Sequence, residues 1–123
     1  MDDVLMFFNR NPDMLPLYQA IEDVISAEFE DVRIKVQKTQ ISLYNKHLFA
    51  CVSLPQRKVK SWPEKCLVLT LGLNRKLEHP RITYAVEPYP GRWTHHILIQ
   101  SETEIDVELI EWIREAYDFA IAK

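Results

Sequence analysis

Hydrophobic residues follow two different periods along this chain of 123 residues. Near both ends they recur at spacings of three and four, which is typical of a helix that buries one face. The first such stretch begins at Asn11-Pro12-Asp13, where a cap residue, a proline and an acid favour a helix start, and it runs to Phe29. The second begins at Ser101-Glu102-Thr103-Glu104, which has the pattern of a capping box, and runs to Ala120. One amphipathic helix is therefore predicted at each end.

Between these helices the period changes to two, which indicates strands. The expected strands cover residues 32–37, 39–44, 47–54, 65–73, 81–87 and 93–100. Asn45-Lys46 suits a two-residue hairpin turn, because asparagine tolerates positive φ. That turn predicts Leu43 opposite Leu48 and Ile41 opposite Ala50.

Helix, five or six strands and helix, joined by short connections, favour an antiparallel meander with both helices on one face of the sheet. The predicted fold class is therefore α+β, a two-layer sandwich. A chain of this length buries one core, so residues 1–123 are expected to form a single domain.

Alternation also predicts which side chains lie on each face of the sheet. Those expected against the helices are Ile41, Leu43, Leu48, Ala50, Val52, Leu54, Leu67, Leu69, Leu71, Ile82, Tyr84, Val86, Trp93, His95, Ile97 and Ile99. Those expected on the open face are Gln40, Ser42, Tyr44, His47, Phe49, Cys51, Ser53, Cys66, Val68, Thr70, Arg81, Thr83, Glu87, Thr94, His96, Leu98 and Gln100. The open face is half apolar and rich in hydroxyl groups, which favours a ligand pocket or a homodimer contact.

The net charge of −3 hides a segregation of charge along the chain. Residues 33–92 carry twelve basic and three acidic residues, a net +9, whereas residues 1–32 carry −7 and residues 93–123 carry −5. A basic sheet beside acidic helices can attract an anionic ligand or nucleic acid. The loop with Arg57, Lys58, Lys60 and Trp62 adds the basic and aromatic composition of nucleic-acid contacts. The alternative is that these charges are solvated and drawn to the acidic helices of the same molecule.

Candidate chemistry centres on the double histidine of Arg92-Trp93-Thr94-His95-His96. Adjacent strand residues point to opposite faces, so the pair is not expected to bind one metal ion. We expect His95 to be partly buried and hydrogen-bonded at the sheet edge, and His96 to lie on the open face beside Arg81. With Glu87, these two residues could carry general acid–base chemistry.

Cofactors, metals and a membrane span are not expected. The chain has only two glycines and no phosphate-binding glycine loop, and its apolar runs are too short to cross a membrane. Its acidic start differs from a signal peptide, which indicates a cytoplasmic protein. Cys51 and Cys66 lack metal-ligand spacing and are expected to be small buried residues, with a disulfide or a reactive thiol as the alternatives.

Three pieces of the chain resemble a family of small bacterial domains of unknown function. They are Lys38-Thr39-Gln40-Ile41-Ser42 with Phe49-Ala50, Pro80-Arg81 with the strand Arg92-Trp93-Thr94-His95-His96, and Glu104-Ile105-Asp106 with the helix segment Trp112-Ile113-Arg114-Glu115-Ala116-Tyr117. Together they span most of the chain. The resemblance implies no activity or substrate, but it draws attention to Lys38, Arg81, Arg92 and His95/His96 as polar members of the motif. The loop 55–64 matches the family pattern poorly.

These observations favour a binding domain, without enzymatic activity, whose open basic face takes an anionic ligand or nucleic acid. The predicted ligand-binding residues are Lys38, Tyr44, Arg81, Arg92 and His96. One alternative is a small enzyme that uses His96 as acid or base and Arg81 to bind an anion. The other is a homodimer that buries the open face.

Overall fold

The computed structural model describes residues 3–55 and 60–123. Six strands form one sheet: β1 (Arg33–Val36), β2 (Ile41–Tyr44), β3 (Leu48–Ser53), β4 (Leu67–Leu73), β5 (Tyr84–Tyr89) and β6 (Arg92–Ile99). The α-helices are α1 (Asp3–Phe7), α2 (Leu15–Glu28) and α3 (Val107–Ile121). Two 3₁₀ turns, η1 (Pro12–Met14) and η2 (Glu102–Glu104), precede α2 and α3. The predicted α+β class is confirmed.

All neighbouring strands are antiparallel, and their order in the sheet is β1-β2-β3-β4-β6-β5. The predicted meander therefore holds from β1 to β4, but the last two strands are exchanged. Residues 74–83 connect β4 to β5, a length that lets the chain skip one strand position. β6 then returns between them through a tight turn in which Gly91 has φ +79°, a conformation that favours glycine.

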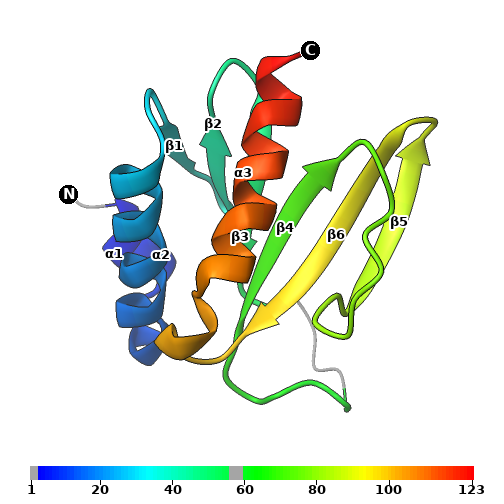
Figure 1. The fold of residues 1–123 in the computed structure, drawn as a ribbon. Coiled ribbons are helices and arrows are strands. Elements are labelled where there is room, and N and C mark those ends of the chain that lie inside the picture. Colours follow the sequence, from blue (N-terminus) through cyan, green and yellow to red (C-terminus); the bar gives the residue numbers. More distant parts are fainter. Residues whose placement is uncertain (1–2, 56–59) are drawn as a thin grey trace.

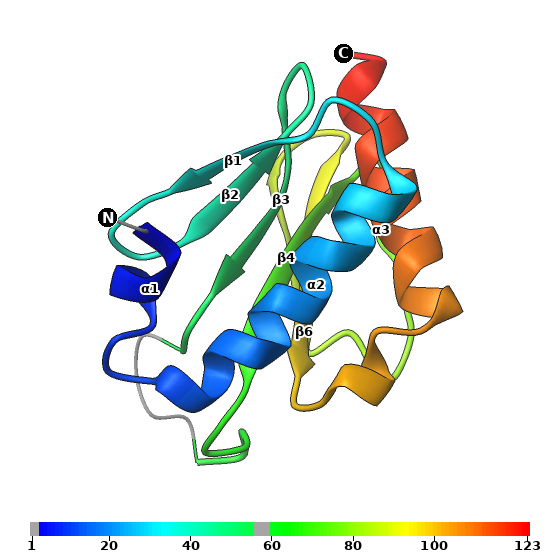
Figure 2. The same ribbon diagram turned by 90° about the vertical axis from the view of Figure 1, so that its left-hand side faces the viewer.

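Helices α2 and α3 lie side by side over one face of the sheet, as Figures 1 and 2 show. Each contributes one apolar stripe to the core, consisting of Leu17, Tyr18, Ile21 and Ile25 from α2 and of Leu109, Trp112, Ile113, Ala116 and Ala120 from α3. The opposite face of the sheet carries no helix in these views. This uncovered surface is called the open face below.

The capping box caps the N-terminus of the 3₁₀ turn η2, not that of the long helix α3. Glu104 Oε1 accepts the backbone N–H groups of Gln100 and Ser101 at 2.7 and 3.1 Å. Helix α3 has its own cap, because Asp106 Oδ1 accepts the N–H of Leu109 at 3.0 Å. The predicted helix therefore begins later than its sequence signature indicates.

The predicted register of the β2–β3 hairpin is wrong. Leu43 pairs with Ala50 and Tyr44 with Leu48, so Phe49 is an extra residue on β3. The turn includes Asn45, whose buried side chain accepts the N–H of His47 at 3.1 Å and donates to the carbonyl of Tyr117 at 2.9 Å. This anchoring to α3 lengthens the turn by a residue. Phe49 consequently faces the helices, with its ring centroid 5.3 Å from that of Tyr117.

The predicted faces of β5 are also reversed. Tyr84 pairs with His96 and Val86 with Thr94, and the Tyr84 ring stacks on His96, so these β5 side chains lie on the open face. Strand β5 is the sheet edge, and α3 lies over β3 and β4 instead. No helix in the described residues covers β5, so no core contact determines which of its alternating side chains face the helical layer.

Candidate ligand-binding pocket on the open face

A row of five paired residues crosses the open face, one from each strand except β1. Ser42 pairs with Cys51, Cys51 with Thr70, Thr70 with His96, and His96 with Tyr84. Paired residues in a sheet present their side chains on the same face. The row therefore brings two hydroxyls, a thiol, an imidazole and a phenol onto one surface.

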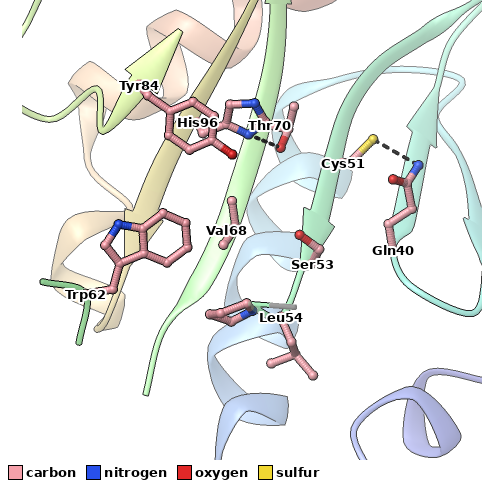
Figure 3. Close-up of a pocket in the computed structure, with 10 residues that line it drawn as sticks. Gln40, Cys51, Ser53, Leu54, Trp62, Val68, Thr70, Tyr84 and His96 are labelled. Carbon is pink, nitrogen blue, oxygen red and sulfur yellow. Dashed lines mark hydrogen bonds between the residues drawn. The ribbon is translucent and has the colours of Figure 1, made fainter. Parts of the chain in front are cut away.

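This row borders a pocket of about 550 Å³, a volume within the range of small-molecule sites. The lining residues are Gln40, Cys51, Ser53, Leu54, Pro55, Trp62, Val68, Thr70, Tyr84 and His96. Figure 3 shows the aromatic residues on one side and Gln40 with Ser53 and Leu54 on the other. Val68 and Thr70 of β4 lie between the two sides.

The aromatic side consists of three rings in nearly parallel planes. The Tyr84 ring lies 4.1 Å from His96 between centroids, at an interplanar angle of 18°. The ring centroid of Trp62 lies 6.4 Å from that of Tyr84, at an interplanar angle of 19°. Such surfaces bind flat, electron-rich or heteroaromatic groups by stacking. We call Trp62, Tyr84 and His96 the aromatic wall.

The His96 ring is positioned by the Thr70 hydroxyl and by the stacked Tyr84 ring, and it is neutral at pH 7. Its Nδ1 atom lies 3.0 Å from the Thr70 hydroxyl oxygen. Burial lowers the pKa of His96 below its ordinary value, and the neighbouring His95 lowers it further. His96 therefore lies on the open face, as predicted, but its closest partners are Thr70 and Tyr84 rather than Arg81.

The two cysteines are free thiols. Cys51 lines the pocket and accepts a hydrogen bond from Gln40 Nε2 at 3.3 Å. Burial raises the pKa of the Cys51 thiol, and burial likewise raises the pKa of Cys66. Both therefore remain protonated at neutral pH, and a protonated thiol is a poor nucleophile.

Arg92 is the predicted cationic residue that lies on the same face as this pocket. Its guanidinium group lies over Gly72, so close that a Cβ at this glycine would stand 2.9 Å from Nη2. Gly72 is two residues from Thr70 on β4, a separation of about 7 Å along a strand. The positive charge of Arg92 also opposes the upward pKa shift that burial imposes on Cys51. Arg92 is not among the residues that line the pocket, but it lies within electrostatic range of it.

The other predicted ligand-binding residues lie elsewhere. Lys38, in the turn between β1 and β2, borders a separate hollow with Met6 and Phe7 near the start of the chain. The Tyr44 ring lies under the guanidinium of Arg33, 5.9 Å from its central carbon. Neither Lys38 nor Tyr44 is among the residues that line the pocket.

Arg81 is a structural residue on the helical side. Its guanidinium group donates to the carbonyl of Glu104 at 2.6 Å and to carboxylate oxygens of Asp106 and Glu108 at 2.9 and 3.2 Å. It also lies over the indole of Trp112, 5.7 Å from the ring centroid. These contacts tie the β4–β5 connection to the start of α3. The predicted pairing of Arg81 with His96 is therefore wrong, because α3 supplies its partners.

Glu87 does not join His96 either. Its Oε2 atom accepts the backbone N–H of Gly91 at 3.2 Å, within the β5–β6 turn. The acid–base group of His96, Arg81 and Glu87 predicted from the sequence is thus not assembled.

His95 is hydrogen-bonded on the helical side, as predicted, but it is fully buried on an inner strand rather than partly buried at the sheet edge. Its Nε2 atom accepts the N–H of Leu77 at 2.8 Å, which fixes the β4–β5 connection against β6. An accepting Nε2 carries no proton, so the ring is neutral. Burial also lowers the pKa of His95. The two adjacent histidines therefore serve different faces of the sheet.

Several cations of the basic segment are paired with carboxylates in the helical layer. Lys65 contacts Asp13, Arg75 binds Glu115 through two hydrogen bonds of 2.8 Å, and Arg81 binds the start of α3. This favours the alternative that the basic charges balance the molecule's own acidic helices. Arg57 and Lys58, part of the predicted nucleic-acid loop, lie outside the described residues. Trp62 of the same loop is the part that reaches the pocket.

Sequence reasoning placed Trp62 in a nucleic-acid loop and Gln40 on the open face, but it put Tyr84 on the wrong face and missed that the three residues line one pocket. Within residues 3–55 and 60–123 there is no cluster of three or more histidine, cysteine or acidic residues able to hold a metal ion. No helix in those residues has the length and apolar character needed to cross a membrane.

Comparison with known proteins gives a family without an assigned activity. Neither curated proteins nor solved structures include a match to the chain. One family model matches, and it covers residues 6–120, nearly the whole chain. The chain therefore belongs to the family described as domain of unknown function DUF5655.

Proposed function

We propose that this domain binds a nucleotide, free or within a single strand of nucleic acid, in the pocket on the open face. The base packs against the aromatic wall and the phosphate lies at Arg92. The observation that carries the proposal is the wall of Trp62, Tyr84 and His96 beside a pocket of about 550 Å³. The guanidinium group of Arg92 lies on the same face and supplies the positive charge for the phosphate.

The chemistry of the pocket matches the two parts of a nucleotide. Aromatic side chains bind bases through stacking, worth about 1–3 kcal/mol per base. Arginine is suited to phosphate because its planar fork donates several hydrogen bonds. Among the described residues Arg92 has no carboxylate partner, so its charge is available to an anion.

The pairing of other cations limits the size of the anion. Lys65, Arg75 and Arg81 already bind carboxylates, which leaves less positive surface for a long duplex. A duplex also hides its bases from an aromatic wall. The proposal therefore favours a mononucleotide or a single strand over double-stranded nucleic acid.

Tryptophan fluorescence and calorimetry with a panel of probes test this proposal. The panel consists of AMP, CMP, UMP, a short single-stranded oligonucleotide and its duplex. We expect Trp62→Ala to weaken binding of the nucleotides and the single strand by about fivefold to a hundredfold, since one stacking contact is worth about 1–3 kcal/mol. We expect Arg92→Gln to weaken binding and to remove most of its salt dependence.

Arg33→Gln is the matched control for Arg92→Gln. The guanidinium carbon of Arg92 lies 6.0 Å from the ring centroid of Tyr89, and that of Arg33 lies 5.9 Å from the ring centroid of Tyr44, but Arg33 is not among the residues that line the pocket. Its replacement should leave affinity unchanged. Absence of binding by every probe at low salt would refute the proposal, and equal losses in both arginine variants would refute the role of Arg92.

A second candidate function uses the contact between the Thr70 hydroxyl and the neutral His96 imidazole. An imidazole that accepts the hydroxyl proton could support ester hydrolysis. A panel of aryl esters and phosphoesters, assayed with His96→Ala beside the wild type, tests this. Activity that persists in His96→Ala would rule it out.

The homodimer alternative rests on the exposed apolar side chains of β5, where Tyr84 and Val86 are 45% and 48% exposed. Pro88 and the register shift between Val86 and Tyr89 disfavour pairing along the edge of this strand. A dimer would therefore have to form through the open face, and sedimentation at micromolar concentration distinguishes it. A monomer excludes the dimer and leaves the pocket open.

A further inference from the structure

The amide group of Gln40 is fixed in one orientation at the edge of the pocket. Its Nε2 atom donates to the Ser42 hydroxyl oxygen at 2.9 Å and to the Cys51 sulfur at 3.3 Å. The side-chain oxygen of Gln37 lies 3.4 Å from the same nitrogen. The nitrogen of this amide is therefore used within the protein.

Ser42 determines which end of the amide faces the pocket. Its hydroxyl donates to Gln37 Oε1 at 2.6 Å, and the residue is fully buried. A hydroxyl has only one proton, so Ser42 can only accept from Gln40. If the Gln40 amide were reversed, its oxygen would face a hydroxyl whose proton is already used, and a buried polar contact would be lost.

The carbonyl oxygen of Gln40 is thereby left for the pocket. Gln40 is a lining residue, and in Figure 3 its oxygen lies on the side of the amide that is turned toward the strand of Cys51 and Ser53. Within the described part of the chain, no residue donates to this oxygen. The pocket thus presents a hydrogen-bond acceptor on the side that faces the aromatic wall.

We propose that Gln40 makes the pocket select bases that carry an exocyclic amino group, such as adenine or cytosine. The inference rests on the proposed nucleotide site. An amino group donates to Gln40 Oε1 while the base packs on the wall. A keto oxygen at the same place, as in hypoxanthine or uracil, would face another acceptor and leave both without a proton. Gln37 and Ser42 are positioning residues, since they act through Gln40.

Two nucleotide pairs test this selection, AMP against IMP and CMP against UMP. In each pair the ring size and the phosphate are the same, the exocyclic group changes from amino to keto, and the adjacent ring nitrogen changes from acceptor to N–H donor. We expect the amino member to bind about tenfold more tightly in the wild type, the value for one hydrogen bond replaced by an unpaired polar group.

Variants of the positioning residues should change this ratio rather than the affinity as a whole. Gln37 is exposed, so Gln37→Ala is expected to fold. It frees the Ser42 proton to donate to Gln40 Oε1, which allows the amide to reverse and present Nε2 to the ligand. The preference for the amino member should then fall to about twofold or less, or pass to the keto member. Ser42→Ala should reduce the preference in the same way.

Ser53→Ala is the matched control, because Ser53 lines the pocket but lies outside the chain of hydrogen bonds from Gln37 to Gln40. It should leave the ratio unchanged. Equal affinities within both pairs in the wild type would overturn the selection and leave the nucleotide site standing. The selection would also be overturned by a ratio that survives Gln37→Ala and Ser42→Ala. Absence of binding by all four nucleotides would instead overturn the proposed function.

Discussion

Replacing Arg81 with glutamine separates a structural role from a ligand-binding role for this residue. Arg81 was the predicted anion-binding partner of His96, but its guanidinium group is engaged by Glu104, Asp106 and Glu108. The side chain is only 21% exposed. We therefore expect Arg81→Gln to lower the free energy of unfolding and to leave nucleotide affinity unchanged.

The magnitude follows from the individual contacts. The partly buried hydrogen bond to the Glu104 carbonyl contributes about 1 kcal/mol. The two carboxylates are about half exposed, so each ion pair adds roughly 0.5 kcal/mol. The contact with the Trp112 ring adds about 0.5–1 kcal/mol. The expected loss is therefore about 2.5–3 kcal/mol, or roughly 10–12 °C in the melting temperature of a domain of this size.

Urea unfolding monitored by circular dichroism measures this loss, and Arg75→Gln is the matched control. Arg75 also binds a carboxylate of α3, that of Glu115, but its side chain is 52% exposed. Its replacement should therefore cost about 0.5–1 kcal/mol. A loss in Arg81→Gln no larger than in Arg75→Gln would refute the structural role. A fall in nucleotide affinity without loss of stability would restore the ligand role.

Three further predictions test the packing and charge assignments. Phe49→Ala should lower the free energy of unfolding by about 3–5 kcal/mol, and Leu48→Ala by clearly less; the reverse order in urea unfolding would support the hairpin register expected from the sequence. Gly72→Ala should displace the Arg92 guanidinium, whose Nη2 would lie 2.9 Å from the new Cβ, and so weaken nucleotide binding several-fold with little change in stability, as titration and melting curves can show. Because burial lowers the pKa of His95 below its ordinary 6.5, the stability from its neutral form is present above pH 6.5 and is lost as the pH falls through the lower, folded-state pKa; urea unfolding that is independent of pH between 7 and 5 would contradict this.

The architecture could be predicted from the sequence because each element carries its own periodic signal. The stripes of both long helices and the alternation of β6 from His95 to Ile99 agree with the burial in the structure, whereas β4 is buried on both faces except at Thr70. The same local signals do not contain the strand order. Whether β5 or β6 pairs with β4 depends on the path of residues 74–83, which no periodic pattern describes.

The candidate site was predicted only in part, for two physical reasons. One residue of difference in the β2–β3 turn moves Phe49 from the open face to the core, and this difference depends on the contact of Asn45 with α3. Likewise, the orientation of the Arg81 side chain depends on carboxylates that are 25 and 27 positions further along the chain. Both predictions, of the Phe49 face and of the Arg81 partners, were wrong because contacts between distant elements determine these features. His96 was placed on the correct face because it lies on a central strand whose phase the core fixes.

The two adjacent histidines show how one strand links the stability of the domain to its pocket. Protonation of His95 requires the loss of the hydrogen bond from the Leu77 N–H, which lowers the stability of the buried face of the sheet. Protonation of His96 places a positive charge under the Tyr84 ring, where a cation is attracted rather than repelled. Both pKa values are lowered first by burial, and His95 contributes to the shift of His96, so a proton on one opposes a proton on the other. Mild acid should therefore weaken folding through the lost bond at His95, whereas the stacking surface at His96 tolerates a proton. His95→Gln and His96→Gln should separate the pH dependence of unfolding from that of nucleotide binding, and a single variant that abolished both would show that the two faces act as one site.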